Sequence, residues 1–227
     1  MKIHYRLALL VTLLTMAHAS PARAQIFDLG DPEDVPYSRG YVSVAGGATV
    51  KEPREAIASV EFGERINDLF EAYLNFTYAR DIMLPKMRQH LDDASVAWTQ
   101  ATGAPYSFSG RDQGLTLTYG GRFLFPTGSP VRVFAGAGFG GIWIRRSITE
   151  ATIGDVTREY GRIYGETDGN VGVGGSYSLK PQGEAVVGVA LGVGRLYADV
   201  AVRRRRVFRT EERLDYQHFT ASLGVRF

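Results

Sequence analysis

The chain has 227 residues, with 26 basic and 24 acidic side chains, 27 glycines and no cysteine. A chain without cysteine has no disulfide framework and no thiolate with which to bind a metal. The first 24 residues contain three of the basic residues and no acidic one, so without them 23 basic residues face 24 acidic ones. This near balance argues against a nucleic-acid partner.

The N-terminal segment has the pattern of a secretory signal peptide. Two basic residues precede an apolar run over residues 7–17, and Ala22-Arg23-Ala24 offers the small residues that a signal peptidase reads. The run is shorter than the roughly 20 residues that a membrane-spanning helix needs. We expect residues 1–24 to be removed and the acidic, proline-containing residues 25–39 to form a periplasmic lead-in.

From residue 40 to residue 227, eight segments alternate apolar residues with polar or small ones. Alternation with a period of two gives a strand one apolar and one polar face. The segments run roughly over residues 40–50, 56–66, 70–78, 114–125, 131–144, 184–193, 196–208 and 219–227. Most connections are short, whereas residues 84–113 and 151–183 form two long ones. Short turns at one end and long loops at the other are typical of bacterial outer-membrane barrels.

The first long connection contains one predicted helix. Pro85 suits the first turn of a helix that continues to about Thr99, and Gly103 ends it; its apolar face comprises Met87, Leu91, Ala94 and Trp98. Such a helix either contacts a receptor or a lipid, or packs on the mouth of the barrel, and we favour packing. The second connection is rich in glycine. It forms either a loop or a protruding hairpin, which would raise the strand count to ten.

Charged residues of both signs lie opposite the apolar stripe. They are Glu61, Arg65, Glu71, Asp81, Arg122, Arg132, Glu184, Asp199, Arg203 and Arg205. Such charges can pair inside a lumen while the aliphatic face lies in lipid. A soluble lipocalin-like barrel would have the reverse polarity. Eight strands enclose a space that side chains fill, so we expect a plugged lumen rather than an open pore.

Four further arginines are predicted at the exterior ends of their strands: Arg145, Arg146, Arg204 and Arg206. Guanidinium groups form bidentate hydrogen bonds with phosphate, which favours contact with lipopolysaccharide. The alternative is that these long side chains only extend to water. The sequence leaves both interpretations open.

The chain from residue 25 onward resembles the eight-stranded outer-membrane β-barrels of Gram-negative bacteria, typified by outer membrane protein X and the transmembrane domain of outer membrane protein A. The signal peptide, the eight alternating segments, the glycine-rich Phe134-Ala135-Gly136-Ala137-Gly138 and the ending Leu223-Gly224-Val225-Arg226-Phe227 carry the resemblance. The ending is similar to the signal read by the barrel-assembly machinery, which implies that role for Phe219, Leu223, Gly224, Val225 and Phe227.

The resemblance implies an all-β, antiparallel, up-and-down transmembrane barrel in the bacterial outer membrane. Its long loops would lie outside the cell, both mature termini would be periplasmic, and outer-membrane lipid and lipopolysaccharide would surround it. We expect a monomer without cofactor or metal, acting as a structural or surface-binding protein in adhesion or lipopolysaccharide contact. The family is functionally diverse, so the alternatives are a lipid A-modifying enzyme and a narrow conduit for small hydrophobic molecules.

The enzyme alternative depends on the last strand. His218 followed by Thr220 resembles the arrangement in outer-membrane lipid A deacylases, but those enzymes have serine two residues after the histidine. Ser222 lies a further two residues away. The period of two directs all three side chains into the lumen, away from an acyl chain in the membrane. We therefore predict no catalytic residue.

Overall fold

The computed structural model describes residues 40–50, 55–127, 131–164, 178–193, 195–208 and 214–227. The predicted signal peptide and lead-in lie outside the described residues, as does the glycine-rich part of the second long connection. No helix in the described part of the chain is long and apolar enough to cross a bilayer.

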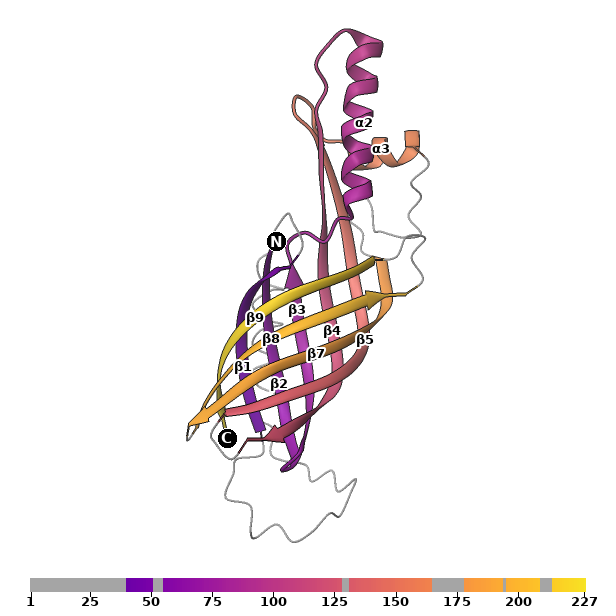
Figure 1. Cartoon of the computed structure of the whole chain (residues 1–227). Helices are drawn as coiled ribbons and strands as arrows, with labels where there is room; N and C mark the ends of the chain where they lie inside the picture. The colour runs from indigo at the N-terminus through magenta and orange to yellow at the C-terminus, as the bar shows by residue number, and fades with distance from the viewer. Residues whose placement is uncertain (1–39, 51–54, 128–130, 165–177, 194, 209–213) are drawn as a thin grey trace, which may run out of the picture. The chain divides into compact units, whose positions relative to one another are not determined.

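Long strands make up most of the described chain (Figure 1). They are β1 (Gly40–Thr49), β2 (Ala56–Asn67), β3 (Phe70–Ala79), β4 (Phe108–Pro126), β5 (Val131–Glu150), β7 (Ser178–Val193), β8 (Leu196–Val207) and β9 (Leu214–Arg226). The short strand β6 (Gly154–Asp155) pairs only with the end of β5. Helices α2 (Pro85–Thr102) and α3 (Thr157–Tyr164) complete the described elements. Each of the eight predicted segments is therefore a strand.

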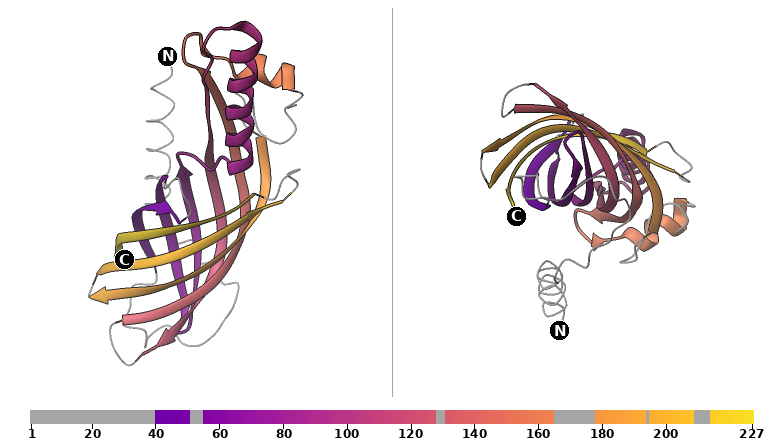
Figure 2. Two further views of the ribbon diagram at one scale, coloured as in Figure 1. Left: turned by 45° about the horizontal axis from the view of Figure 1, so that its top comes forward. Right: turned by 90° about the horizontal axis from the view of Figure 1, so that it is seen from below.

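The eight long strands form a closed antiparallel barrel. Figure 2 (right) shows it from below. Neighbouring strands pair in chain order, and β9 returns to pair with β1, with Val44 opposite Leu223. Gly40 and Phe227 exchange backbone hydrogen bonds of 3.0 and 2.9 Å. Closure satisfies the backbone groups that an edge strand would leave unpaired. The predicted eight-stranded up-and-down architecture is confirmed.

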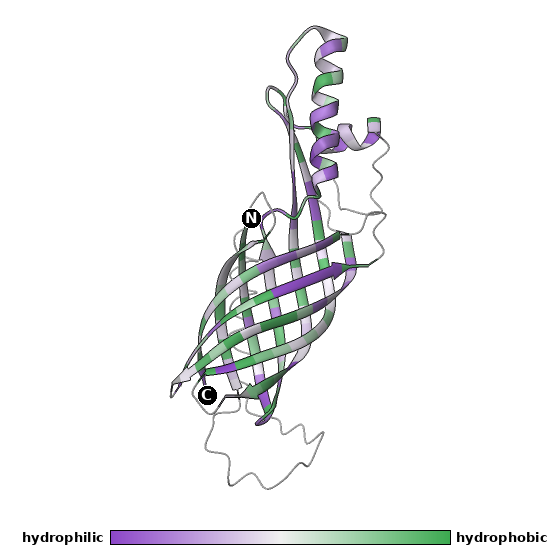
Figure 3. Ribbon diagram, viewed as in Figure 1, coloured by the Kyte–Doolittle hydropathy of each residue, from purple (hydrophilic) through white to green (hydrophobic). Residues whose placement is uncertain are grey.

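Exposed and buried residues alternate along the strands. Figure 3 shows how hydrophobic and hydrophilic residues are distributed over the same strands. Tyr119, Phe139 and Leu223 point outward and are 66%, 63% and 70% exposed. Their neighbours Thr118 and Ser222 point inward and are buried. An apolar exterior is costly in water but favourable in lipid. The polarity of the barrel is therefore that of a membrane barrel.

Four strands extend well beyond the predicted bounds. β7 begins at Ser178 rather than at residue 184, and β9 begins at Leu214 rather than at residue 219. β4 begins at Phe108 rather than Gly114, and β5 continues to Glu150 rather than Ile144. The extensions of β4 and β5 pair with each other, with Phe108 opposite Glu150, at the end of the strands away from the turn that joins them. In the second long connection, the described residues add only the two-residue strand β6, which pairs with the end of β5.

The predicted bounds of β4 and β5 follow the outward apolar stripe, which does not continue into the extensions. A strand pair that continues past the barrel needs no outward apolar stripe, because its backbone hydrogen bonds and its packing against α2 hold it together.

The predicted helix in the first long connection is confirmed as α2, which continues three residues further, to Thr102. Met87, Leu91 and Ala94 are buried on one face, as expected from their spacing. Gly103 follows the helix with a φ of 72°, a left-handed conformation that glycine adopts without the strain of a Cβ atom.

Candidate functional site

The barrel lumen contains a cluster of charged side chains centred on Arg122, which is completely buried. Its Nε lies 2.8 Å from Glu71 Oε2, and its Nη1 lies 3.2 Å from Glu61 Oε1. Its Nη2 donates to the hydroxyls of Tyr41 and Tyr197, at 2.7 Å each. A buried guanidinium is tolerated only when paired and hydrogen-bonded in this way.

Two further arginines extend this cluster through Glu184. Arg205 Nε lies 2.6 Å from Glu184 Oε2, and Arg203 Nη1 lies 2.8 Å from Glu184 Oε1. Arg203 also contacts Glu61, which joins the two halves. Three arginines therefore face three glutamates in one connected network, and their formal charges balance.

The other four predicted lumen charges lie apart from this network. Arg65 bonds Asp68 at the β2–β3 turn, at 2.8 Å. Asp81 pairs with Arg88 of α2 at 2.7 Å, and Asp199 accepts a hydrogen bond from Ser222 at 2.6 Å. Arg132 is half-buried and joins no ion pair among the described residues. The period of two predicts the face of the strand on which each residue lies. The position of the residue along the barrel axis determines which side chain it contacts.

His218 of β9 lies inside the barrel, as its parity predicts. Its side chain is fully buried and stacks on Tyr216, with ring centroids 5.8 Å apart, and neither ring nitrogen has a hydrogen-bond partner among the described residues. Thr220 is buried as well, and the Ser222 hydroxyl is engaged by Asp199. These three residues do not form a nucleophile, base and acid with access to lipid.

The four arginines predicted at the exterior rim divide into two pairs. Arg204 and Arg206 of β8 point outward, with side chains 61% and 47% exposed, and both approach Asp215, at 3.4 and 3.8 Å. Arg146 instead lies on the inward face of β5 and pairs with Asp112 at 2.9 Å. Arg145, its neighbour, is half-buried on the opposite face of β5. Adjacent residues of a strand point to opposite faces, so two neighbouring arginines in the sequence do not form one charged patch in the structure.

Beyond the barrel, α2, α3 and the β4–β5 extension form a protrusion with an apolar core of its own (Figure 1). Leu91 and Met87 of α2, Ile148 of β5 and Tyr160 of α3 are all buried in it. Gly110 of β4 permits the close approach of the helix. A Cβ atom there would lie 2.8 Å from Leu91 Cδ1 and 2.9 Å from Met83 Cε.

Both helices of the protrusion are held by carboxylates. Asp81 Oδ1 accepts the backbone N–H groups of Met83 and Asp112, at 2.8 and 3.0 Å, while its other oxygen binds Arg88. At the start of α3, Asp155 accepts hydrogen bonds from the hydroxyl and the backbone N–H of Thr157. These hydrogen bonds lower the pKa of the Asp155 carboxyl. The protrusion is thus tied to the barrel mouth and ordered locally.

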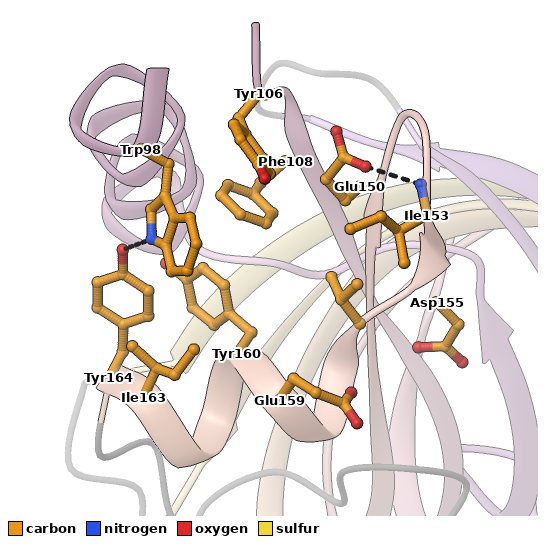
Figure 4. A pocket seen from close by; sticks show the side chains of 11 residues that line it. Trp98, Tyr106, Phe108, Glu150, Ile153, Asp155, Glu159, Tyr160, Ile163 and Tyr164 are labelled. Carbon is orange, nitrogen blue, oxygen red and sulfur yellow. Dashed lines mark hydrogen bonds between the residues drawn. The ribbon is translucent and has the colours of Figure 1, made fainter. Parts of the chain in front are cut away.

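The protrusion contains a cavity of about 370 Å³, shown in Figure 4. Aromatic side chains from α2, β4, α3 and the α2–β4 connection line it: Trp98, Tyr106, Phe108, Tyr160 and Tyr164. Trp98 Nε1 donates to the Tyr164 hydroxyl at 2.8 Å, so the rings are held against one another. The helical spacing predicts that Trp98 lies on the apolar face of α2, but it does not predict this cavity. Tyr106 and Phe108 follow the helix closely, but the remaining lining residues, from Glu150 to Tyr164, lie much later in the chain, and no local pattern connects them to Trp98.

No family model and no curated protein matches the chain. Among solved structures, the chain is similar to a Neisserial surface protein, NspA, with 15% identity, a TM-score of 0.50, and coverage of 83% of this chain and 96% of NspA. It is also similar to Ail, the attachment invasion locus protein of Yersinia pestis, with 9% identity, a TM-score of 0.47, and coverage of 84% and 99%. The N-terminal β-barrel domain of Pseudomonas aeruginosa OprF is similar as well, with 11% identity, a TM-score of 0.47, and coverage of 84% of this chain and 99% of the OprF domain.

Identities this low speak for the fold alone. The closed barrel described above and the similarity to NspA agree on strand number and topology. The chain therefore has the fold of the eight-stranded outer-membrane β-barrels.

Proposed function

We propose that this protein is an integral outer-membrane barrel whose protrusion binds a ligand at the cell surface. The observation that carries the proposal is the aromatic-lined cavity in a protrusion with its own buried core. A protrusion that served only to connect strands needs neither feature. Binding sites commonly lie on loops that a rigid scaffold holds in place.

The outward apolar residues support a position in the membrane. On β4 the outward residues change from Arg111 and Gln113 to Leu115, and from there the stripe continues to Phe125. A strand crosses the hydrocarbon in about 9–11 residues, which matches this length. The residues of β4 before Leu115 then lie in water, together with the protrusion that they support.

The connections support the orientation. The β2–β3 and β7–β8 turns lie at the end of the barrel that contains Gly40 and Phe227, while both long connections lie at the other end. In bacterial outer-membrane barrels the short turns are periplasmic and the long loops extracellular. The protrusion would therefore face outward from the cell.

The lumen network supports a plugged barrel. Arg122, Arg205 and Glu184 fill its middle with at most 4% exposure, and Phe134 and Tyr73 pack beside them. Moving a solute through this layer would require breaking several buried ion pairs. The interior thus favours a scaffold for surface binding over a conduit.

Labelling of single cysteines tests the orientation, because the natural chain has no cysteine. We expect Gln100→Cys, on the exposed end of α2, to react with a membrane-impermeant maleimide on intact cells. Arg195→Cys, at the short-turn end, is the matched control and should react only after the outer membrane is opened. The reverse pattern, or equal labelling of both variants on intact cells, would overturn the proposal.

A further inference from the structure

The walls of the cavity in the protrusion combine aromatic rings with negative charge. Of its eleven lining residues, five are aromatic, three are aliphatic, three are the acids Glu150, Asp155 and Glu159, and none is basic. An anionic ligand would be repelled by these walls, and a purely apolar ligand would make no use of the acids. A cation with an apolar surface suits both parts.

The aromatic part is preorganised. The ring centroids of Trp98 and Tyr106 are 5.5 Å apart, and those of Phe108 and Tyr160 are 5.6 Å apart. Tyr160 also stacks on Tyr164 at 4.5 Å. Rings that already support one another lose little freedom when a ligand enters. The faces of such rings attract cations, and clusters of them recognise methylated ammonium groups.

The three acids differ in how far they are already engaged. Glu150 accepts the backbone N–H groups of Thr152 and Ile153, at 2.7 and 2.8 Å, and Asp155 is engaged by Thr157. Glu159 is exposed on α3 and has no hydrogen bond or ion pair with another described residue. Figure 4 shows the acids on the side of the cavity away from Trp98. Glu159 is therefore the carboxylate best able to meet a charged ligand.

We propose that this cavity binds an organic cation with a methylated ammonium head, of the kind that choline carries. The inference rests on the proposed function, because only an exterior cavity would meet such a ligand outside the cell. The volume of about 370 Å³ lies at the lower end of small-molecule sites, which suits a compact head group. The same head occurs free in solution and on choline lipids.

The test uses the full barrel in nanodiscs of phosphatidylglycerol, a lipid without choline. Calorimetry compares choline with dimethylbutanol, the uncharged isostere in which a carbon replaces the ammonium nitrogen. We expect choline to bind about tenfold more tightly, a ratio typical of a cation–π site. Glu159→Gln should weaken choline binding by about threefold and leave the isostere unaffected, consistent with the loss of one exposed charge.

Two variants complete the design. Asp92→Asn, on the exposed face of α2 and outside the cavity, removes the same charge and should leave choline binding unchanged. Trp98→Leu keeps an apolar wall but removes a ring, and it should reduce choline binding more than isostere binding. Its folding is checked by the difference in gel mobility between boiled and unboiled samples. If Trp98→Leu does not fold, the effect of Glu159→Gln on choline binding still tests whether the cavity binds a cation.

Equal affinity for choline and its isostere, or no binding of choline, would overturn the inference. Capture of phosphatidylcholine vesicles that free choline prevents would identify a lipid head group as the source. Binding of choline without vesicle capture would identify a free solute as the source. Either result supports a ligand with a methylated ammonium head. If α2 is labelled from outside but choline does not bind, the ligand class alone fails. If choline binds but α2 is not labelled, the proposed function alone fails.

Discussion

Arg205 Nε lies 2.6 Å from Glu184 Oε2, and neither side chain is accessible to solvent. Arg205 also donates to Asn75 and Thr77 of β3, at 3.0 and 2.8 Å. The residue thus connects β8 to β3 on the other side of the barrel. Its neighbour Arg204 has the opposite parity and is 61% exposed.

This contrast provides a matched pair of substitutions. Arg205→Leu leaves Glu184 with one arginine partner instead of two and should lower the free energy of unfolding by about 3–5 kcal/mol. Arg204→Leu should change it by less than about 1 kcal/mol, because exposed ion pairs contribute little. Urea unfolding in lipid vesicles measures both. Equal losses would show that the lumen network contributes no more than the surface.

The closing pair of strands provides a second test at two adjacent glycines. A Cβ atom at Gly47 would lie 1.9 Å from the backbone oxygen of Phe219 on β9, whereas one at Gly46 meets nothing within 4 Å. Gly47→Ala should therefore destabilise the barrel by about 1–3 kcal/mol, as overpacking does. Gly46→Ala should be tolerated. The folded fraction in unboiled gels checks this, and tolerance of both would contradict the described register.

Removal of Phe227 tests the predicted assembly signal. The Phe227 ring is 64% exposed, so it contributes little packing within the barrel. We expect its deletion to reduce the amount of barrel in the outer membrane while secretion across the inner membrane continues. Phe125→Ala, which removes an outward ring that is 51% exposed and not terminal, is the control. Normal outer-membrane levels of the deletion variant would contradict the assignment.

Arg204 and Arg206 test contact with lipopolysaccharide. Their outward position at the end of β8 would place both guanidinium groups near the phosphates of the outer leaflet. The double change Arg204→Ala and Arg206→Ala should leave folding intact and reduce lipopolysaccharide retained after detergent washing by about fivefold. Equal retention by both proteins would mean that these arginines only extend to water and pair with Asp215.

His218 tests the enzyme alternative. Because the ring is completely buried in the lumen, it cannot reach an acyl chain outside the barrel. We expect mass spectra of lipid A to be the same with the protein, without it, and with His218→Ala. An acyl chain that is lost only when His218 is present would establish a hydrolase and overturn the surface-binding proposal.

Local sequence alone determined the faces of the barrel and the helix of the protrusion. Leu223 outward and Ser222 inward follow from a period of two, because successive side chains of a strand point to opposite sides. Met87, Leu91 and Ala94 share a face because helical neighbours recur every three or four residues. Gly103 could be read as a helix stop for an equally local reason, its tolerance of positive φ.

Only the tertiary structure determined the contacts between residues that lie far apart in the sequence. Glu61 and Arg203 meet through closure of the barrel although 142 residues separate them. Arg146 pairs with Asp112 because β5 continues as a strand to Glu150, which keeps Arg146 on the inward face of the strand. At the cavity, Trp98 donates a hydrogen bond to Tyr164, which lies 66 residues later in the chain. Periodicity gives the direction of a side chain, but only the register of distant strands and the packing of α2 on them determine what that side chain contacts.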